Sequence, residues 1–353
     1  MKLFKLINYV PIPSSLSYSW NFGSLLGLFL VIQILSGLFL ASHYEASMSS
    51  FWSVILIDFD VFSGWLVRSF HANGASFFFI IVYLHIWRSL WFSCFTQFYV
   101  WCSGIVIIFT MMAVAFMGYV LPWGQMSFWG ATVITNLLSA LPLVGKDLVI
   151  WVWGGFSVSH PTLERLFTLH FLLPFILLIF VLIHIIFLHQ EGSSNPLGLD
   201  LNSDKIYFYP YFYLKDLVGA FICLFVFSVV CINSPDFFMD PDNFIECNPM
   251  ITPPHIQPEW YFLFAYAILR SVPNKLGGVL ALVLSILSLL VLSKGSSISG
   301  RFSMKRKFLV YSFISTFFIL SWLGSLPAEY PFTLLSQVMS LIYFTLILCF
   351  MIT

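Results

Sequence analysis

Charged side chains are scarce in this sequence. Lys, Arg, Asp and Glu make up only 8% of its 353 residues, whereas 60% of the residues are hydrophobic. A soluble domain of this size cannot hide that much apolar surface, so the chain is expected to lie in a lipid bilayer. The 15 basic and 15 acidic residues cancel, which argues against nucleic acid as a partner. The six cysteines show no CxxC or CxxCH spacing, which argues against a cysteine metal cluster and against covalent attachment of a prosthetic group.

Long hydrophobic runs are what the sequence does contain. Each run has about twenty largely apolar residues, the length that spans a bilayer as an α-helix. Such runs occur at 22–43, 64–92, 103–121, 168–189, 216–233, 276–293, 308–326 and 332–352. The sequence therefore predicts an all-α membrane protein with about eight transmembrane helices, the first of which is not a cleaved signal.

Basic residues are unevenly distributed between the two sides that these spans define. Ten of the fifteen basic residues, from Lys2 and Lys5 to the cluster at 305–307, fall on the side of the N-terminus, called the N side. Most acidic residues, including Asp58 and Glu259, fall on the opposite side, called the P side. The positive-inside rule then makes the N side the cytoplasm or the matrix.

Two pairs of histidines share a spacing of fourteen residues within apolar runs: His71 with His85, and His170 with His184. Fourteen residues rise about 21 Å along an α-helix and return to nearly the same face. The two spans run in the same direction, so His71 is expected to meet His170 near the P side, and His85 to meet His184 near the N side. Imidazole is a common axial ligand of heme. The pattern predicts two bis-histidine hemes at two depths of the membrane.

Glycine repeats the same fourteen-residue interval in the first and third spans. Gly23 and Gly37 lie in the first span, and Gly104 and Gly118 lie in the third. Gly23 and Gly104 are expected beside the N-side histidines, and the other two beside the P-side histidines. Missing side chains at these levels would admit the edge of a heme. The alternative is close packing of small residues between membrane helices.

Two arginines stand three residues outside the histidines. Arg68 precedes His71 and Arg88 follows His85. Each guanidinium is expected just beyond a heme level, where heme propionates need cationic partners. The alternative is ordinary snorkelling of a long charged side chain to the membrane interface.

The chain is expected to divide into a four-helix diheme bundle, residues 1–200, and a four-span half, residues 201–353. On the P side of the second half, Pro258–Tyr261 opens an aromatic amphipathic stretch that reaches Tyr266. A carboxylate at a helix start commonly caps the helix or stabilises its dipole. In an apolar pocket near a heme, however, the carboxylate of Glu259 is also suited to accept a proton.

Polar residues also occur at the N-side ends of two spans. His189 lies five residues after His184, and Lys215 and Asp216 begin the fifth span. Solvated charges at the membrane interface are the usual explanation for such residues. Together with Ser24, they would alternatively form a polar pocket for a quinone.

Several segments resemble a known family over nearly the whole chain. They are Ser17–Gly27, Phe70–Ser76, Gly118–Asn136, Pro258–Arg270 and Pro273–Leu280. In these segments the sequence resembles the mitochondrial cytochrome b family, whose members are the diheme subunits of quinol:cytochrome c reductase (the cytochrome bc complex, respiratory complex III).

The resemblance implies two heme b groups and two quinone sites. His71 and His170 would bind the low-potential heme, and His85 and His184 the high-potential heme. The matching positions of the P-side quinol-oxidation site are Phe116, Tyr119, Gly130, Ile134, Pro258, Glu259, Phe262 and Tyr266, with Glu259 as a proton carrier. The matching positions of the N-side quinone-reduction site are Ser24, His189, Lys215 and Asp216.

The mechanism that the resemblance implies is a Q cycle. Quinol gives one electron to an iron-sulfur partner and the other, through the two hemes, to a second quinone, with proton release on the P side and uptake on the N side. The implied partners are a Rieske-type iron-sulfur protein, a cytochrome c-type subunit, other complex III subunits, membrane lipid and a second copy of the complex in a homodimer. The implied location is the mitochondrial inner membrane.

Two positions depart from the family pattern. Gln190-Glu191 follows His189 where many relatives place Glu directly after the histidine, and Trp87 precedes Arg88 where glycine is common. The first departure affects the N-side proton path, and the second affects packing near the N-side heme.

Two other classes of protein fit part of the sequence. A membrane transporter or channel would use the four histidines to line a proton or metal path, and it would show no heme absorbance. A diheme membrane anchor or transmembrane reductase subunit would bind hemes but would lack a P-side site that is sensitive to changes at Glu259.

Overall fold

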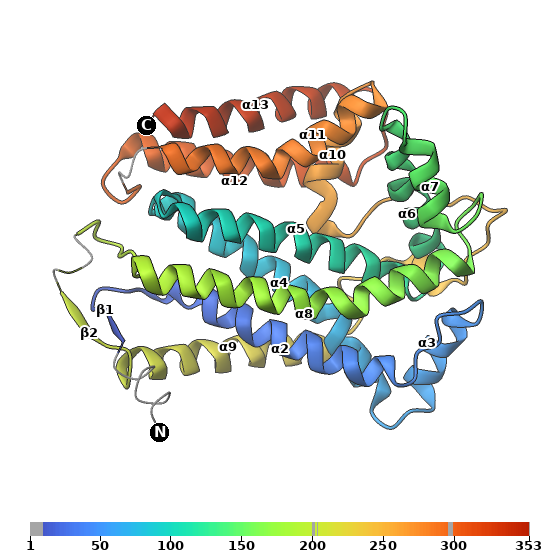
Figure 1. Cartoon of the computed structure of the whole chain (residues 1–353), viewed down its shortest axis with the longest axis horizontal. Coiled ribbons are helices and arrows are strands. Elements are labelled where there is room, and N and C mark those ends of the chain that lie inside the picture. Colours follow the sequence, from blue (N-terminus) through green and yellow to red (C-terminus); the bar gives the residue numbers. More distant parts are fainter. Residues whose placement is uncertain (1–9, 200–201, 203, 296–298, 353) are drawn as a thin grey trace.

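The computed structural model describes residues 10–199, 202, 204–295 and 299–352. Within these residues, eight helices are long and apolar enough to cross a membrane, which confirms the predicted all-α membrane fold (Figure 1). They are α2 (Phe22–Ala41), α4 (Gly64–Trp91), α5 (Phe98–Val120), α8 (His160–Glu191), α9 (Tyr211–Asn233), α11 (Lys275–Leu287) with its 3-10 extension (Ser288–Lys294), α12 (Met304–Gly324) and α13 (Phe332–Ile352). Lys2 and Lys5, which contribute to the charge-based orientation, lie outside the described residues.

Several helices extend beyond their apolar runs, and α8 extends the most. It begins at His160 rather than at 168, because Pro161 occupies its first turn and the hydroxyl of Thr162 accepts a hydrogen bond from the backbone N–H of Ser159 at 3.1 Å. Its 32 residues rise about 48 Å, whereas bilayer hydrocarbon is about 30 Å thick. The ends of α8 therefore reach past the hydrocarbon, and its P-side end supports the connections on that side.

The first four spans pack as two pairs. α2 packs along α4, and α5 packs along α8. Pro174 lies inside α8 without ending it, as membrane helices permit. The fifth span, α9, packs against α4 and α2 and lies at the edge of the molecule opposite α13 in Figure 1.

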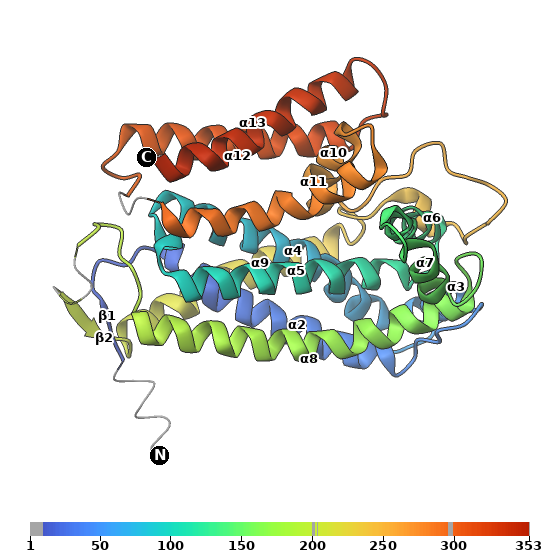
Figure 2. The ribbon, with the colours of Figure 1, turned by 45° about the horizontal axis from the view of Figure 1, so that its top comes forward.

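The remaining helices form a second group of packed elements. α10 (Leu263–Ser271) packs against α11, α12 and α13, and Figure 2 shows α12 and α13 running beside each other. The hydroxyl of Tyr343 in α13 donates to the carbonyl oxygen of Ser285 in α11 at 2.8 Å. The hydroxyl of Tyr83 in α4 donates to the carbonyl oxygen of Tyr261 at 2.6 Å. This second bond joins the segment before α10 to the histidine-bearing helix.

The connections between the spans on the P side are folded. The connection between α2 and α4 contains α3 (Ser50–Phe59), and the connection between α5 and α8 contains α6 (Gln125–Asn136) and α7 (Gly145–Trp153). All three helices lie at one end of the molecule (Figure 1). The backbone N–H of Gln125 donates to the carbonyl oxygen of Ile245 at 2.9 Å, and that of Cys247 donates to Trp123 at 3.2 Å. These bonds join the connection after α5 to the connection after α9.

A small sheet lies at the opposite, N-side end. β1 (Pro11–Pro13) pairs with β2 (Lys205–Tyr207) in antiparallel register, with Ile12 opposite Ile206. This sheet was not predicted from the sequence, because strands of three residues produce no readable alternation of polar and apolar positions.

Candidate functional site

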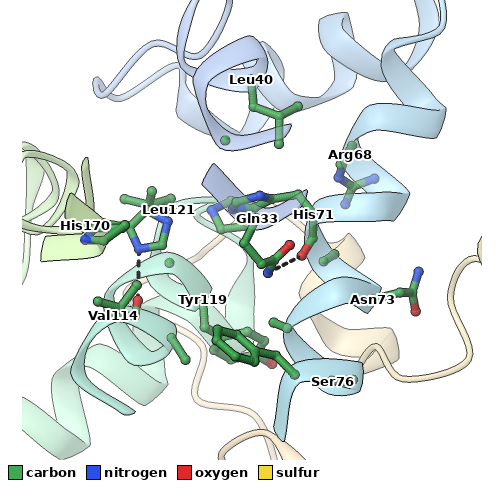
Figure 3. Close-up of a pocket in the computed structure, with 18 of the residues that line it drawn as sticks. Gln33, Leu40, Arg68, His71, Asn73, Ser76, Val114, Tyr119, Leu121 and His170 are labelled. Carbon is green, nitrogen blue, oxygen red and sulfur yellow. Dashed lines mark hydrogen bonds between the residues drawn. The ribbon is translucent and has the colours of Figure 1, made fainter. Parts of the chain in front are cut away.

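The P-side histidines face each other from α4 and α8. The ring centroids of His71 and His170 are 6.1 Å apart, and the ring planes are nearly perpendicular, at 89°. Both side chains line a cavity of about 280 Å³ between the helix pairs (Figure 3). The structure thus brings together two imidazoles that lie 99 positions apart in the sequence.

The N-side histidines lie one 14-residue interval further along the same two helices. His85 Nδ1 is 3.1 Å from Nη2 of Arg88, and His184 Nδ1 is 2.8 Å from the hydroxyl of Ser103. A guanidinium can only donate hydrogen bonds. Nδ1 of His85 therefore accepts a hydrogen bond from Arg88, and the neutral ring carries its proton on Nε2. Before Nε2 can bind a metal, the proton must move to Nδ1, so Arg88 must release this contact.

Each of the four predicted glycines lies against one of the histidines. A Cβ placed on Gly118 would be 2.5 Å from Cε1 of His170, and one on Gly37 would be 3.0 Å from Cε1 of His71. At the N-side level, a Cβ on Gly104 would be 3.5 Å from Cε1 of His184, and one on Gly23 would be 3.7 Å from Cε1 of His85. The fourteen-residue interval therefore places a glycine beside each of these four histidines. The two P-side glycines have the least space for a side chain.

Arg68 is already engaged by an acidic partner. Its guanidinium forms an ion pair with Asp58 of α3, lies 5.9 Å from the ring centroid of Phe244 and lines the P-side cavity (Figure 3). Burial raises the pKa of the Asp58 carboxyl above its usual range, and the charge of Arg68 opposes this rise. The guanidinium of Arg68 thus lies at the wall of the P-side cavity, and Asp58 partly compensates its charge.

The two levels fit a planar group that takes two axial imidazoles. Among the described residues, no three His, Cys, Asp or Glu side chains gather as ligands of a bare metal ion. Beside the N-side level, the guanidinium of Arg88 lies 5.1 Å from the ring centroid of Trp20. Trp20 Nε1 and Arg88 Nε are both buried there, and neither finds a hydrogen-bond partner within the described part of the chain. Two unsatisfied donors suit a carboxylate such as a heme propionate.

A second, smaller cavity of about 30 Å³ lies beside the P-side histidine cavity. Its lining includes all eight residues expected at a quinol-oxidation site: Phe116, Tyr119, Gly130, Ile134, Pro258, Glu259, Phe262 and Tyr266. Val133, Ile256 and Gln257 also line it. These three were not predicted, although Val133 and Gln257 each adjoin a predicted residue and Ile256 lies two residues before Pro258. Among the described residues, only Tyr119 and Glu259 line both cavities, so these two side chains form the wall between them.

Glu259 is an unusual carboxylate. Burial, and then the nearby charge of Asp240, raise its pKa from the usual 4.5 to about 8, although a hydrogen bond with Tyr119 acts in the opposite direction. The residue precedes a 3-10 helix (Trp260–Phe262), but its side chain makes no capping hydrogen bond. The geometry therefore does not favour a capping role for Glu259. Its raised pKa instead allows the carboxyl to gain and lose a proton at a pH near 8.

Three of the four predicted N-side quinone residues lie together. The side chains of Ser24 and Asp216 are hydrogen-bonded, and the ammonium of Lys215 donates to the carbonyl oxygen of Leu16 at 2.5 Å. His189 is exposed, and no hydrogen bond or ion pair joins it to the other three within the described residues. The structure thus assembles Ser24, Lys215 and Asp216 but leaves His189 apart.

Asn21 is a buried polar residue that the sequence analysis missed. Its side-chain amide donates to the carbonyl oxygen of Lys215 at 3.0 Å and holds the start of α9 against the start of α2. A Cβ on Gly219 would be 3.1 Å from Nδ2 of Asn21, so this glycine leaves room for the amide. An asparagine directly before a long apolar run is the signal that would have identified it.

Trp87, one of the two departures from the family pattern, packs against α12. Its ring centroid lies 5.4 Å from that of Phe317 and 5.6 Å from that of Phe318. The extra bulk therefore lies at the contact between α4 and α12. The other departure, Gln190-Glu191, continues α8 to its end at Glu191.

The fold and the site define a polytopic helical membrane protein built around two levels of facing histidines. The chain belongs to the cytochrome b/b6 family. Residues 7–192 match the family model "Cytochrome b/b6/petB", and residues 246–344 match "Cytochrome b(C-terminal)/b6/petD". A solved chain described as "Hyperthermophilic respiratory Complex III" is 31% identical, with a TM-score of 0.92 over 99% of this chain and 95% of that chain. Membership of this family makes the protein a heme-binding redox subunit of the membrane.

The glycine distances predict a graded effect of added side chains on heme content. Gly118→Ala is expected to lose most of the P-side heme, because its Cβ would overlap the ring of His170, whereas Gly23→Ala would make only an ordinary contact with His85. Heme per chain, measured from the reduced absorbance of the purified protein, checks this order. Equal heme loss in the two variants would contradict it.

Proposed function

We propose that this chain is the diheme cytochrome b subunit of a respiratory quinol:cytochrome c oxidoreductase. The observation that carries the proposal is the wall formed by Tyr119 and Glu259, which joins the cavity of the P-side histidines to a second cavity lined by the expected quinol residues. In the proposed mechanism, the buried carboxyl of Glu259 would accept a proton between the quinol pocket and the P-side heme. The likeness to a chain described as part of a respiratory Complex III supports the proposal.

The four histidines would hold two heme b groups. His71 and His170 would ligate the P-side, low-potential heme, and His85 and His184 the N-side, high-potential heme. When bound, these hemes would carry single electrons across the membrane from the P side to the N side. Gly23, Gly37, Gly104 and Gly118 would leave space beside the axial rings, and Arg68 and Arg88 would face the propionates.

Glu259 is the proposed acceptor of a quinol proton. A carboxylate accepts a proton most effectively when its pKa lies near the working pH, and burial beside Asp240 brings the pKa of Glu259 to about 8. Its hydrogen bond with Tyr119 orients the carboxyl at the wall of the small cavity. The proton can then pass toward the larger cavity, which Asp240 and Arg68 also line, and from there to the P side.

Oxidation of quinol releases two electrons and two protons. We propose that one electron leaves to a Rieske-type iron-sulfur protein and that the other crosses the membrane to a second quinone. Phe116, Gly130, Ile134, Pro258, Phe262 and Tyr266 would shape the apolar pocket that holds the quinol ring. Release of both protons on the P side couples electron transfer to proton translocation.

The N-side quinone would be reduced between α2 and α9. Asp216, hydrogen-bonded to Ser24, and Lys215 would supply protons and hydrogen bonds to the quinone oxygens. His189 is a second proposed proton donor, which would have to turn toward this site from the exposed end of α8. Proton uptake here would complete the charge separation of a Q cycle.

The complete reaction needs other proteins. We propose a Rieske-type iron-sulfur protein, a cytochrome c-type subunit, further complex III subunits and a second copy of the complex as partners, in the lipid of the mitochondrial inner membrane. The multi-span fold and the likeness to a Complex III chain support this assembly. The division into a diheme bundle at 1–200 and a four-span half at 201–353 stays a prediction.

The proposal is tested by quinol:cytochrome c reductase activity of the purified complex. We expect quinol to reduce both b hemes and cytochrome c, with protons released on the P side of reconstituted vesicles. The control is the same complex with Tyr266→Leu, a change in the small cavity that should slow quinol oxidation without removing heme. A complex with both hemes that quinol does not reduce would instead indicate a diheme anchor, and a folded chain without heme would indicate a transporter.

A further inference from the structure

Two serines contact the axial histidines in the same way. Ser36 Oγ lies 2.9 Å from Nδ1 of His71, and Ser103 Oγ lies 2.8 Å from Nδ1 of His184. Each serine directly precedes the glycine that lies against the same ring, Gly37 or Gly104. The first contact is at the P-side level and the second is at the N-side level.

The direction of these hydrogen bonds follows from the remaining contacts of each hydroxyl. Ser36 Oγ has the carbonyl oxygens of Ile32 at 2.7 Å and Gln33 at 3.3 Å as acceptors, and Ser103 Oγ has those of Tyr99 at 2.8 Å and Val100 at 2.9 Å. The carbonyl oxygens of Gln33 and Val100 are also hydrogen-bonded to His71 and His184, so each ring shares its serine contact with a backbone acceptor. A hydroxyl has one proton but two acceptor lone pairs. Because the proton is directed to the carbonyl oxygen one helical turn earlier, the oxygen faces the imidazole as an acceptor. The ring must then carry its proton on Nδ1, which leaves the lone pair on Nε2 for a metal.

The opposing ring at each level has no such hydroxyl. His170 Nδ1 donates to the carbonyl oxygen of Val114 at 2.8 Å, and Met117 precedes its glycine. His85 Nδ1 contacts Arg88, and Phe22 precedes its glycine. Each level therefore pairs one histidine that bonds a serine with one that does not. This asymmetry allows a single substitution to alter one axial ring at one level.

We propose that Ser36 and Ser103 are positioning residues that hold the tautomer and orientation of His71 and His184, and thereby set the reduction potential of the heme at each level. This inference rests on the proposed diheme function. When a serine oxygen accepts a hydrogen bond from Nδ1–H, the imidazole becomes a stronger electron-pair donor to a metal through Nε2. A stronger donor stabilises ferric over ferrous heme and lowers the potential. The donation of each hydroxyl to a carbonyl strengthens its oxygen as an acceptor.

The test uses the purified complex with Ser36→Ala or Ser103→Ala. We expect two hemes per chain in both variants. In Ser36→Ala, the reduction potential of the P-side heme should rise, so that the ratio of oxidised to reduced heme at a fixed potential falls about fivefold, as for loss of one ordinary hydrogen bond. The low-temperature electron paramagnetic resonance spectrum of that ferric heme should also shift. The N-side heme should stay unchanged. In Ser103→Ala, the same changes should appear at the N-side heme alone.

Two controls separate this effect from a general disturbance of packing. Ser36→Thr and Ser103→Thr keep a hydroxyl and should restore the wild-type potential and resonance. Thr110→Val is matched to Ser103, because Thr110 also bonds to a carbonyl one turn earlier in α5, that of Val106, but makes no histidine contact among the described residues. It should move neither heme.

Unchanged potentials and spectra in both alanine variants would overturn the inference, as would equal shifts of both hemes in one variant. If an alanine variant loses a heme, retention by the threonine variant supports the inference and loss in both overturns it. Fewer than two hemes in the wild-type complex would instead overturn the proposed diheme function, so the two failures are distinguishable.

Discussion

His184→Leu is expected to remove the N-side heme and to keep the P-side heme. Leucine is similar in size but offers no axial nitrogen, so one of the two ligands at this level is lost. His71 and His170, which lie about 21 Å away along the helices, should be undisturbed. Heme per chain should therefore fall from two to one, and the component with the higher potential should disappear from a redox titration.

The matched control for this variant is His160→Leu. His160 lies in the first turn of the same helix and is 3.5 Å from Glu164 rather than at a histidine level. It should keep both hemes, and binding of quinol on the P side should be unchanged in either variant. If His184→Leu keeps two hemes and only lowers stability, the assignment of His184 as a ligand is wrong.

Glu259→Gln is expected to slow quinol oxidation by about a hundredfold, the usual contribution of a positioned acid or base. The amide keeps the shape and hydrogen-bonding ability of the side chain but cannot accept the quinol proton. Because burial and Asp240 hold the pKa of Glu259 at about 8, wild-type turnover should rise as the pH approaches 8 and the carboxylate forms. This rise should be absent in the variant. Steady-state turnover from pH 6 to pH 9 checks both statements.

Stability gives a second readout of the same pKa. The folded state binds the Glu259 proton more tightly than the unfolded state, in which the pKa is near 4.5. The free energy of unfolding should therefore fall as the pH rises from about 4.5 to about 8, and Glu259→Gln should lack this fall. Glu246→Gln, an exposed change in the same connection, is the control for both readouts. A variant that keeps full turnover and the wild-type pH profile would remove Glu259 from the mechanism.

The fourteen-residue spacing was enough to predict the two histidine levels and the glycines beside them, because a helix converts spacing into depth and direction. The eight membrane spans followed from apolar length alone. Their ends did not. α8 begins eight residues before its apolar run because Pro161 and the contact of Thr162 with Ser159 start the helix outside the hydrocarbon.

Contacts between distant segments were beyond sequence reasoning. Asp240 lies near enough to Glu259 to raise its pKa, and Tyr119 shares the same wall from 140 positions earlier. No spacing rule predicts either contact, because both depend on how the two P-side connections fold together. Similarly, the direction of Arg88 toward His85, rather than away from the histidine level, depends on the packing of the guanidinium against Trp20.

A stepwise redox titration of the purified complex, with iron counted per chain and quinol then added as the reductant, measures the proposed electron path itself. We expect two b hemes per chain, each titrating as a one-electron component at its own midpoint, and both reducible by quinol. A single heme, or two hemes that quinol does not reduce, would contradict the proposed path for electrons from the P side to the N side.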